Sequence, residues 1–292
     1  MKLTPALIRS LIKPRKRASN KGDYGHVLVV AGSKGMPGAP VLCAAGAMRG
    51  GAGLVTVAVP DSQYDIIARR LLPEAMVLPL PERNGCISSS GFPGLKKYIR
   101  DRKVSSVVIG PGMRVNKDTF RLVKRLIDLA GIAVIADADA LNVFAGDPKA
   151  LGNAKADLII TPHPGEMSRL TGLRITEIQG RRGGIAKEFA KRYRLVCVLK
   201  GDGTIISDGK RVFVNSTGNP GMAKGGSGDT LAGIIAALAV QVKEPTFLNA
   251  ALAGVYIHGL AGDIAAGKKT AIGMTAGDIA EAVPAALKRL KV

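Results

Sequence analysis

The chain has 292 residues, of which 47% are hydrophobic and only 4% are aromatic. This length accommodates one large domain, and a core of Ala, Val, Ile and Leu favours a parallel α/β architecture over an aromatic-rich sandwich. The formal net charge of +20 suits either nucleic acid or a small anionic substrate as the ligand. Nucleic acid is the less favoured, because the basic residues are spread along the chain without interleaved aromatic residues.

The three cysteines, Cys43, Cys86 and Cys197, are scattered along the chain. Their spacing is not typical of a zinc site or of a disulfide framework. The N-terminal residues lack the apolar segment of a signal peptide, and no run approaches the roughly 20 apolar residues of a membrane span. We therefore expect a cytoplasmic protein that makes no membrane contact.

Residues 1–25 are basic and polar and are expected to form a leader, with Lys13–Arg17 as a solvated arm. Residues 26–292 show neither a linker nor an internal repeat and are expected to form one domain. Strand-like apolar runs alternate there with helical patterns. The expected strands are 26–32, 54–59, 106–110, 133–136, 158–160, 195–199, 204–207 and 211–214. The expected helices are 38–49, 61–71, 116–130, 175–193, 229–241, 246–266 and 275–290.

This alternation predicts a single-domain α/β fold with a mostly parallel central sheet and helices on both faces. In such sheets a ligand binds outside the carboxyl ends of the strands. The loops rich in Gly, Pro, Asp and His all follow expected strands, so they should lie on one rim of the sheet. These loops are 32–38, 110–112, 137–142, 161–166 and 200–203.

The segment Asn219-Pro-Gly-Met-Ala-Lys-Gly-Gly-Ser-Gly-Asp229 leads into an apolar helix. A helix start exposes unpaired backbone N–H groups, and glycines let that backbone approach a phosphate closely. Asp229 would then face a transferred phosphoryl group, where a carboxylate can take a proton from an attacking hydroxyl. Alternatively, the glycines only form a tight turn and Asp229 only caps the helix. In the first of these interpretations, the anion hole would be formed by Gly225, Gly226, Ser227 and Gly228.

Two further loops contain candidate site residues. In Lys200-Gly-Asp-Gly-Thr204 the lysine could meet a phosphate, although for this segment alone a hairpin turn with a solvated lysine is the favoured interpretation. In Thr161-Pro-His-Pro-Gly-Glu166 two prolines stiffen the loop. Glu166 could hold Mg²⁺ through water or cap a helix, and His163 could orient an anionic or nicotinamide group or make a structural hydrogen bond.

Asp137 and Asp139 follow another strand. They could join the same electrostatic site, and for Asp139 we favour helix capping.

Taken together, these segments resemble the ribokinase-like superfamily and, more closely, the ADP/ATP-dependent NAD(P)H-hydrate dehydratase family. The resemblance covers residues 21 to about 285. The glycine–aspartate signature alone is typical of the superfamily, whereas the 161–166 loop and the complete 219–229 segment are typical of the dehydratases. Related kinases have Asn-x-x-Glu where this chain has His163-Pro-Gly-Glu166, which favours a dehydratase over a vitamin or sugar kinase. The remaining matching segments are 21–26, 31–33, 110–112, 137–142, 200–201 and 254–259.

The resemblance implies repair of NADH or NADPH that has been hydrated on its nicotinamide ring, in the S epimer. A nucleotide phosphorylates the ring hydroxyl, which then leaves as phosphate and restores NAD(P)H. Bacterial and archaeal-type members generally use ADP and release AMP. The resemblance thus implies Mg²⁺ and ADP, or ATP, as the phosphoryl donor.

The resemblance also implies roles for individual residues, with Asp229 as the catalytic base. The nucleotide would be bound by Lys200, Gly201, Asp202, Gly203, Thr204 and Gly228. The hydrated cofactor would contact Ala39, Gly112, His163 and Asp229. Glu166 is the candidate for water-mediated contact with Mg²⁺.

Two other functions stay open. A small-molecule kinase of the same fold, of the thiazole or pyrimidine type, would release a stable phosphorylated product. A basic nucleic-acid-binding protein would show strongly salt-dependent binding. Because family members often form tetramers, we expect a homo-oligomer, with the Ala/Gly-rich helix at 38–52 as a candidate interface. Many members have an N-terminal epimerase domain; only about 25 residues precede the first strand, so we expect a separate epimerase.

Overall fold

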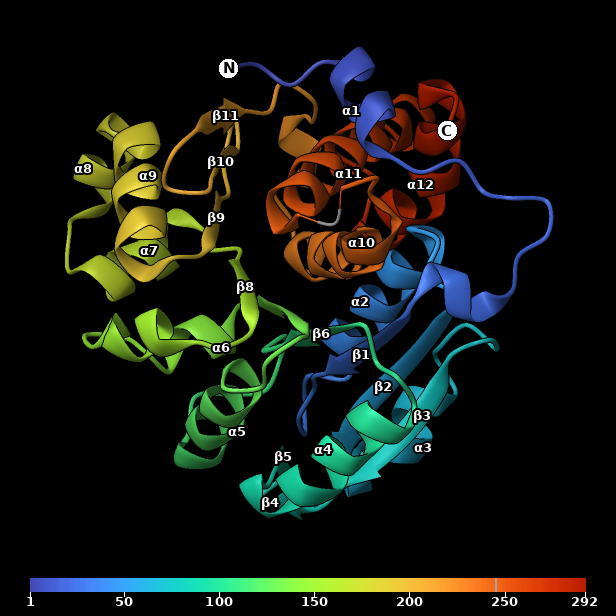
Figure 1. The fold of residues 1–292 in the computed structure, drawn as a ribbon, viewed down its shortest axis with the longest axis vertical. Coiled ribbons are helices and arrows are strands. Elements are labelled where there is room, and N and C mark those ends of the chain that lie inside the picture. The colour runs from blue at the N-terminus through green and yellow to red at the C-terminus, as the bar shows by residue number, and fades with distance from the viewer. Residues whose placement is uncertain (245) are drawn as a thin grey trace.

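A computed structural model describes residues 1–244 and 246–292 (Figure 1). Among these, nine strands form one sheet in the order β11-β10-β9-β8-β7-β6-β1-β2-β3. Neighbouring strands are parallel, except that β10 is antiparallel to both β9 and β11. The strands are β1 His26–Val30, β2 Leu54–Pro60, β3 Met76–Leu80, β6 Ser106–Ile109, β7 Ala133–Ala136, β8 Asp157–Ile160, β9 Val196–Leu199, β10 Ile205–Ser207 and β11 Val212–Val214.

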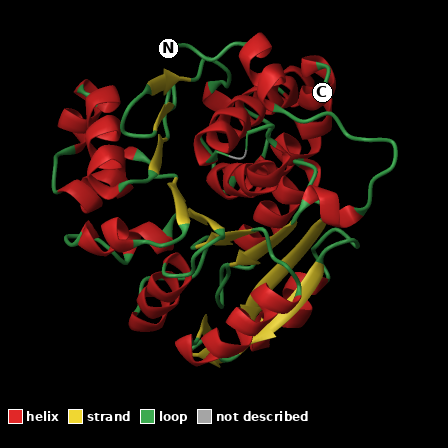
Figure 2. Cartoon of the chain, in the orientation of Figure 1, coloured by secondary structure: helices red, strands yellow, loops and turns green. Residues whose placement is uncertain are grey.

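Helices cover both faces of this sheet, as Figure 2 shows. Successive strand residues point to opposite faces, so Val27 and Val29 of β1 enter one core while Leu28 and Val30 enter the other. The predicted α/β architecture is therefore confirmed. The first core is covered by α2 Gly38–Arg49, α10 Ser227–Gln241, α11 Phe247–Lys269 and α12 Ala276–Leu290. The second is covered by α4 Phe92–Asp101, α5 Lys117–Ile127, α6 Asp139–Asn142, α7 Pro164–Thr171, α8 Ile175–Gly180 and α9 Arg182–Tyr193.

Helices α2 and α10 pack backbone against backbone. A Cβ atom on Gly46 would overlap the carbonyl oxygen of Thr230, and one on Gly233 would overlap that of Cys43. Close contact of this kind requires residues without side chains. Gly46 of α2 is therefore used for packing within the chain, whereas a Cβ on Gly38 would meet no atom within 4 Å; the subunit interface expected at this helix stays a prediction. The contact also fixes the start of α10 relative to the sheet.

Several predicted elements differ from the structure. The expected helix at 61–71 is only a 3-10 turn, Asp61–Gln63, followed by α3, Tyr64–Ala68. The expected helix at 175–193 is interrupted at Arg181, whose φ of −134° is not helical. Some elements of the structure were not predicted: β3, the short hairpin of β4 (Glu82–Arg83) and β5 (Cys86–Ile87), and helices α4 and α7.

The first 25 residues pack on the domain more closely than a leader would. Helix α1, Pro5–Leu11, buries Ile8 completely, and Leu3 N donates to Val214 O at the edge strand β11. The basic cluster is not simply solvated, because Arg15 donates to Gly51 O and stacks over the ring of Tyr24. The N-terminal segment thus extends the sheet edge and covers the first core.

Helix α11 is long and apolar enough to cross a membrane by length and composition, contrary to the expectation that no segment would be. In the structure, however, 78% of its most apolar stretch is buried within the protein. A helix that is apolar all round is also typical of a core element. The packing therefore makes α11 a core helix of the protein.

Candidate active site

The glycine–aspartate segment forms the start of α10. The helix begins at Ser227, two residues earlier than expected, and its N-cap Gly226 has a left-handed φ of +89°. A Cβ on Gly226 would overlap Leu42 of α2, so glycine is required there. Among the described residues, the N–H groups of Gly228 and Asp229 have no hydrogen-bond partner. Together with the positive end of the helix dipole, they are suited to bind an anion, whereas the N–H of Ser227 is already paired with Lys224 O at 3.3 Å.

Asp229 lies in this first turn rather than capping the helix. Burial raises its pKa, and repulsion from Asp137 raises it further, while Lys200 partly opposes both effects; the resulting pKa is about 7. An aspartate in water has a pKa near 4. A carboxylate with a pKa near neutrality is a much better proton acceptor than an ordinary aspartate at physiological pH. The position and the pKa of Asp229 both suit a general base.

Lys200, at the end of β9, forms a largely buried ion pair with Asp137, which follows β7. Its Nζ lies 2.7 Å from Asp137 Oδ1 and 3.7 Å from Glu166 Oε2. Burial alone would lower the pKa of Lys200, but the Asp137 and Glu166 carboxylates outweigh that effect and raise it. The lysine is thus fully charged and held beside Gly228, since a Cβ on Gly228 would lie 3.2 Å from Nζ.

The rest of the expected nucleotide loop is a tight turn. Gly201 and Gly203 have φ values of +142° and +59°, and Thr204 Oγ1 donates to Gly201 O at 3.0 Å. Arg182, at the start of α9, donates to the carbonyl oxygens of Leu199 and Asp202. The arginine therefore holds this loop through its backbone, a role that the sequence reading missed.

His163 and Glu166 cap α7 reciprocally. His163 Nδ1 accepts from Gly165 N at 2.9 Å, while Glu166 Oε2 accepts from His163 N at 2.7 Å. The helix-capping alternative for Glu166 is therefore present in the structure. Burial lowers the pKa of His163, and the nearby Lys200 and Arg169 lower it further, so its ring is neutral with the proton on Nε2. That nitrogen lies 3.5 Å from Glu166 Oε1, in a side chain that is half exposed on the rim.

Ala39 and Gly112 meet at the topological switch point of the sheet. The strand order reverses between β1 and β6, and this is where α/β sheets form their binding crevice. Gly32 N donates to Pro111 O at 2.8 Å, and Ser33 Oγ donates to Gly112 O at 2.7 Å. A Cβ on Gly112 would lie 3.1 Å from that of Ala39. The two expected substrate residues are thus neighbours.

A protein-only metal centre is not present in the described part of the chain, where no three His, Cys, Asp or Glu side chains converge as a metal would require. Glu166 Oε2 is already used by the cap. Mg²⁺ commonly retains several waters and binds mainly through substrate phosphates plus one or two carboxylates. The carboxylate of Glu166, the expected contact for Mg²⁺, is compatible with that second arrangement.

Other details depart from the expectations. Asp139 does not cap α6 but accepts a hydrogen bond from Arg114 N at 2.8 Å. The sequence reading also missed the contact between Ser227 Oγ and His258 Nε2, at 3.4 Å. Burial lowers the pKa of His258 to about 4, so this histidine is a neutral support for the anion site.

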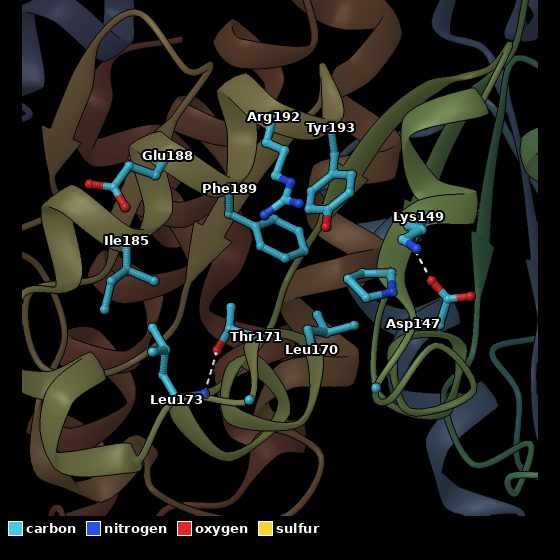
Figure 3. Close-up of a pocket in the computed structure, with 13 residues that line it drawn as sticks. Asp147, Lys149, Leu170, Thr171, Leu173, Ile185, Glu188, Phe189, Arg192 and Tyr193 are labelled. Carbon is cyan, nitrogen blue, oxygen red and sulfur yellow. Dashed lines mark hydrogen bonds between the residues drawn. The ribbon is translucent and has the colours of Figure 1, made fainter.

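A cavity of about 510 Å³ lies away from these residues, between α9 and the end of α7 (Figure 3). Phe189 and Tyr193 line one side of it, and Leu170 and Thr171 line another. It contains none of the expected site residues. The candidate active site is therefore placed at the carboxyl rim, where the expected site residues lie together, and not in this cavity.

Solved structures of other proteins superimpose on this fold over almost the whole chain. A ribokinase-like superfamily protein from Enterococcus faecalis superimposes with a TM-score of 0.83 at 28% identity, over 99% of this chain and 95% of that one. The structure of the ADP/ATP-dependent NAD(P)H-hydrate dehydratase from Bacillus subtilis, co-crystallized with ATP/Mg²⁺, gives a TM-score of 0.81 at 32% identity, over 98% and 97% of the two chains. The chain therefore has the ribokinase-like fold.

The family follows from the sequence comparison. The protein-family model described as NAD(P)H-hydrate dehydratase matches residues 27–285 of this chain. The chain therefore belongs to this family. It is 42% identical to the bifunctional NAD(P)H-hydrate repair enzyme of Moorella thermoacetica, over 99% of this chain but 54% of that protein. It thus spans about half the length of such relatives. By contrast, the ADP-dependent (S)-NAD(P)H-hydrate dehydratase of Bacillus subtilis is 33% identical over 97% of this chain and 96% of that protein.

Proposed function

We propose that the chain dehydrates the S epimer of hydrated NADH or NADPH with ADP as phosphoryl donor, restoring NAD(P)H and releasing AMP and phosphate. The observation that supports this most directly is Asp229, which has a pKa of about 7 and lies in a helix turn with unpaired N–H groups. The proposal also draws on the Bacillus subtilis relative, whose name specifies ADP and the S epimer.

The chemistry has two steps. Asp229 takes the proton of the ring hydroxyl, whose oxygen attacks the terminal phosphorus of ADP, so that the P–O bond to AMP breaks. The N–H groups of Gly228 and Asp229 stabilise the charge on the transferred group. The carbon–oxygen bond of the phosphorylated ring then breaks, phosphate leaves, and loss of a proton from the neighbouring carbon restores the double bond.

The remaining rim residues bind the two substrates in this proposal. Lys200 and the turn Gly201–Thr204 hold the nucleotide phosphates, with Gly228 allowing their close approach. Ala39, Gly112 and His163 contact the hydrated cofactor along the switch-point crevice, with the Nε2 proton of His163 as a hydrogen-bond donor.

Mg²⁺ fits the charge of this rim. Asp137, Glu166 and Asp229 place three acidic groups around one ammonium, so an incoming phosphate would meet net negative charge. Mg²⁺ bound with the nucleotide would neutralise part of it, with Glu166 contacting the ion through water. A homotetramer, a separate epimerase and a cytoplasmic location stay predictions.

Product analysis tests this proposal. The protein is incubated with hydrated NADH, ADP and Mg²⁺, and nucleotides and phosphate are separated and quantified. Equal amounts of AMP, inorganic phosphate and NADH support the dehydratase. A stable phosphorylated product without NADH would instead identify a small-molecule kinase.

A further inference from the structure

The carboxylate of Asp137 fixes the end of the Lys200 side chain. Asp137 Oδ1 accepts from Lys200 Nζ at 2.7 Å and from the Thr161 hydroxyl at 2.7 Å. Its side chain is only 2% exposed, against 20% for Lys200. A lysine side chain is otherwise flexible, and fixing it costs considerable rotamer entropy. Asp137 therefore determines where the ammonium lies before any ligand arrives.

The backbone at Asp137 is itself held in an unusual turn. The next residue, Ala138, has φ +51° and ψ −117°, a combination that is unfavourable for residues with a Cβ. The turn packs against Gly110, where a Cβ would overlap the Asp137 carbonyl oxygen. Strain of this kind persists only where the surrounding structure enforces it, and it is concentrated at functional sites. The turn fixes the point from which the carboxylate reaches Lys200.

The fixed ammonium lies beside the anion site. A Cβ on Gly228 would lie 3.2 Å from Lys200 Nζ and 3.5 Å from Asp137 Oδ2. An ammonium has three donors. Asp137 takes one and Glu166 is placed for a second, so a third is available to an anion at the start of α10.

We propose that Asp137 is a positioning residue for the nucleotide: it holds the Lys200 ammonium beside Gly228, where the ammonium meets a phosphate of bound ADP. This inference rests on the proposed use of ADP and extends it. Asp137 does not bind the phosphate itself, because two anionic groups repel each other. Its effect on ADP binding is exerted through Lys200.

Calorimetric titration of the full chain with ADP and Mg²⁺ tests this role in four proteins: wild type, D137N, K200M and the D137N/K200M double variant. D137N is expected to bind ADP about tenfold more weakly, equivalent to about 1.4 kcal/mol, because the ammonium loses its fixed position. The double variant is expected to bind ADP as K200M does. It leaves neither member of the pair charged and unpaired, so it can be measured even if D137N does not fold, and a loss beyond that of K200M would show that Asp137 acts other than through Lys200.

Asp139 provides the matched control. D139N makes the same chemical change two residues further along, where the carboxylate accepts from Arg114 N and makes no ion pair with Lys200. It should bind ADP like the wild type. In D137N, K200M and the double variant, the KM for hydrated NADH should change less than the affinity for ADP does. The reason is that the hydrated cofactor is proposed to lie on the side of Ala39 and Gly112.

Two results would overturn the role of Asp137: unchanged or tighter ADP binding by folded D137N, or a further loss in the double variant relative to K200M. Failure of the proposed function is distinguishable from these. A wild-type protein that binds ADP but restores no NADH would contradict the dehydratase and leave the inference about Asp137 standing. A wild-type protein that does not bind ADP would overturn both.

Discussion

His163 and Glu166 satisfy each other's backbone at the start of α7, with His163 N donating to Glu166 Oε2 at 2.7 Å and His163 Nδ1 accepting from Glu166 N at 3.3 Å. Because Nδ1 is an acceptor, the proton of the neutral ring is on Nε2. The same contact that stabilises the helix therefore also sets the tautomer in which His163 can donate to a substrate.

The two roles of His163 are separable by substitution. H163N keeps a good N-cap side chain but lacks the ring nitrogen, so we expect a KM for hydrated NADH about tenfold higher with a melting temperature near that of the wild type. H163A should show the same rise in KM and also lose about 1 kcal/mol of stability through the missing cap. Steady-state kinetics and thermal unfolding measure both; an unchanged KM in H163N would remove His163 from the substrate site.

Substitution of Asp229 tests the proposed base. D229N is close in shape to the wild type but cannot accept a proton, so turnover should fall by about 10²-fold or more. ADP binding should be largely kept, because the N–H groups of the first turn of α10 are unaltered. Turnover and calorimetric ADP titration are measured side by side. If D229N retains near-normal turnover, another group is the base.

Activity should depend on the protonation of Asp229. Burial first, and then the Asp137 charge, raise its pKa to about 7, and only the deprotonated form accepts a proton. Turnover should therefore rise as pH increases from about 6 to 8. A pH–rate profile of the wild type checks this, and a profile that is flat down to pH 5 would contradict it.

Stability should show the opposite trend. The folded-state pKa of about 7 lies above the unfolded value near 4, so between these pH values the folded state binds more protons than the unfolded state. Asp229 therefore makes stability fall as pH rises through this window. D229N should melt above the wild type at pH 8, with a smaller difference at pH 5. Equal melting temperatures at pH 8 would show that the buried charge costs little.

In the turn before α10, alanine should be tolerated at Gly225 but not at Gly226. G226A forces a Cβ into Leu42 at a φ of +89°, and we expect a loss of about 1–3 kcal/mol. G225A is the matched control for stability, because a Cβ on Gly225 would meet no atom within 4 Å. Chemical denaturation of both variants measures the difference. Equal stabilities would mean that the turn adjusts freely.

The sequence predicted most of the fold because buried parallel strands are continuous apolar runs, as β1, β2 and β6 are. It failed where the pattern is weak. Helix α7 begins at Pro164 in a segment that was expected to be a loop, with helix capping considered only as an alternative role for Glu166. The break at Arg181 has no proline beside it, and helical periodicity continues on both sides.

The individual site residues were predictable, but their pairing was not. Asp137 and Lys200 were each placed after a strand, yet they are 63 residues apart in the chain. Their contact depends on β7, β8 and β9 being neighbours in that order, which a single sequence does not specify. Arg182 was missed for the same reason, because it acts on backbone carbonyl groups of a loop 17 and 20 residues away.

Recovery of the reduced-nicotinamide absorbance from hydrated NADH is the most direct measurement of the central claim. It is followed with Mg²⁺ and ADP, ATP or no nucleotide, using the wild type and D229N. We predict recovery only with a nucleotide, fastest with ADP, and about 10²-fold slower or more for D229N. No recovery by folded, ADP-binding wild-type protein would contradict the dehydratase function.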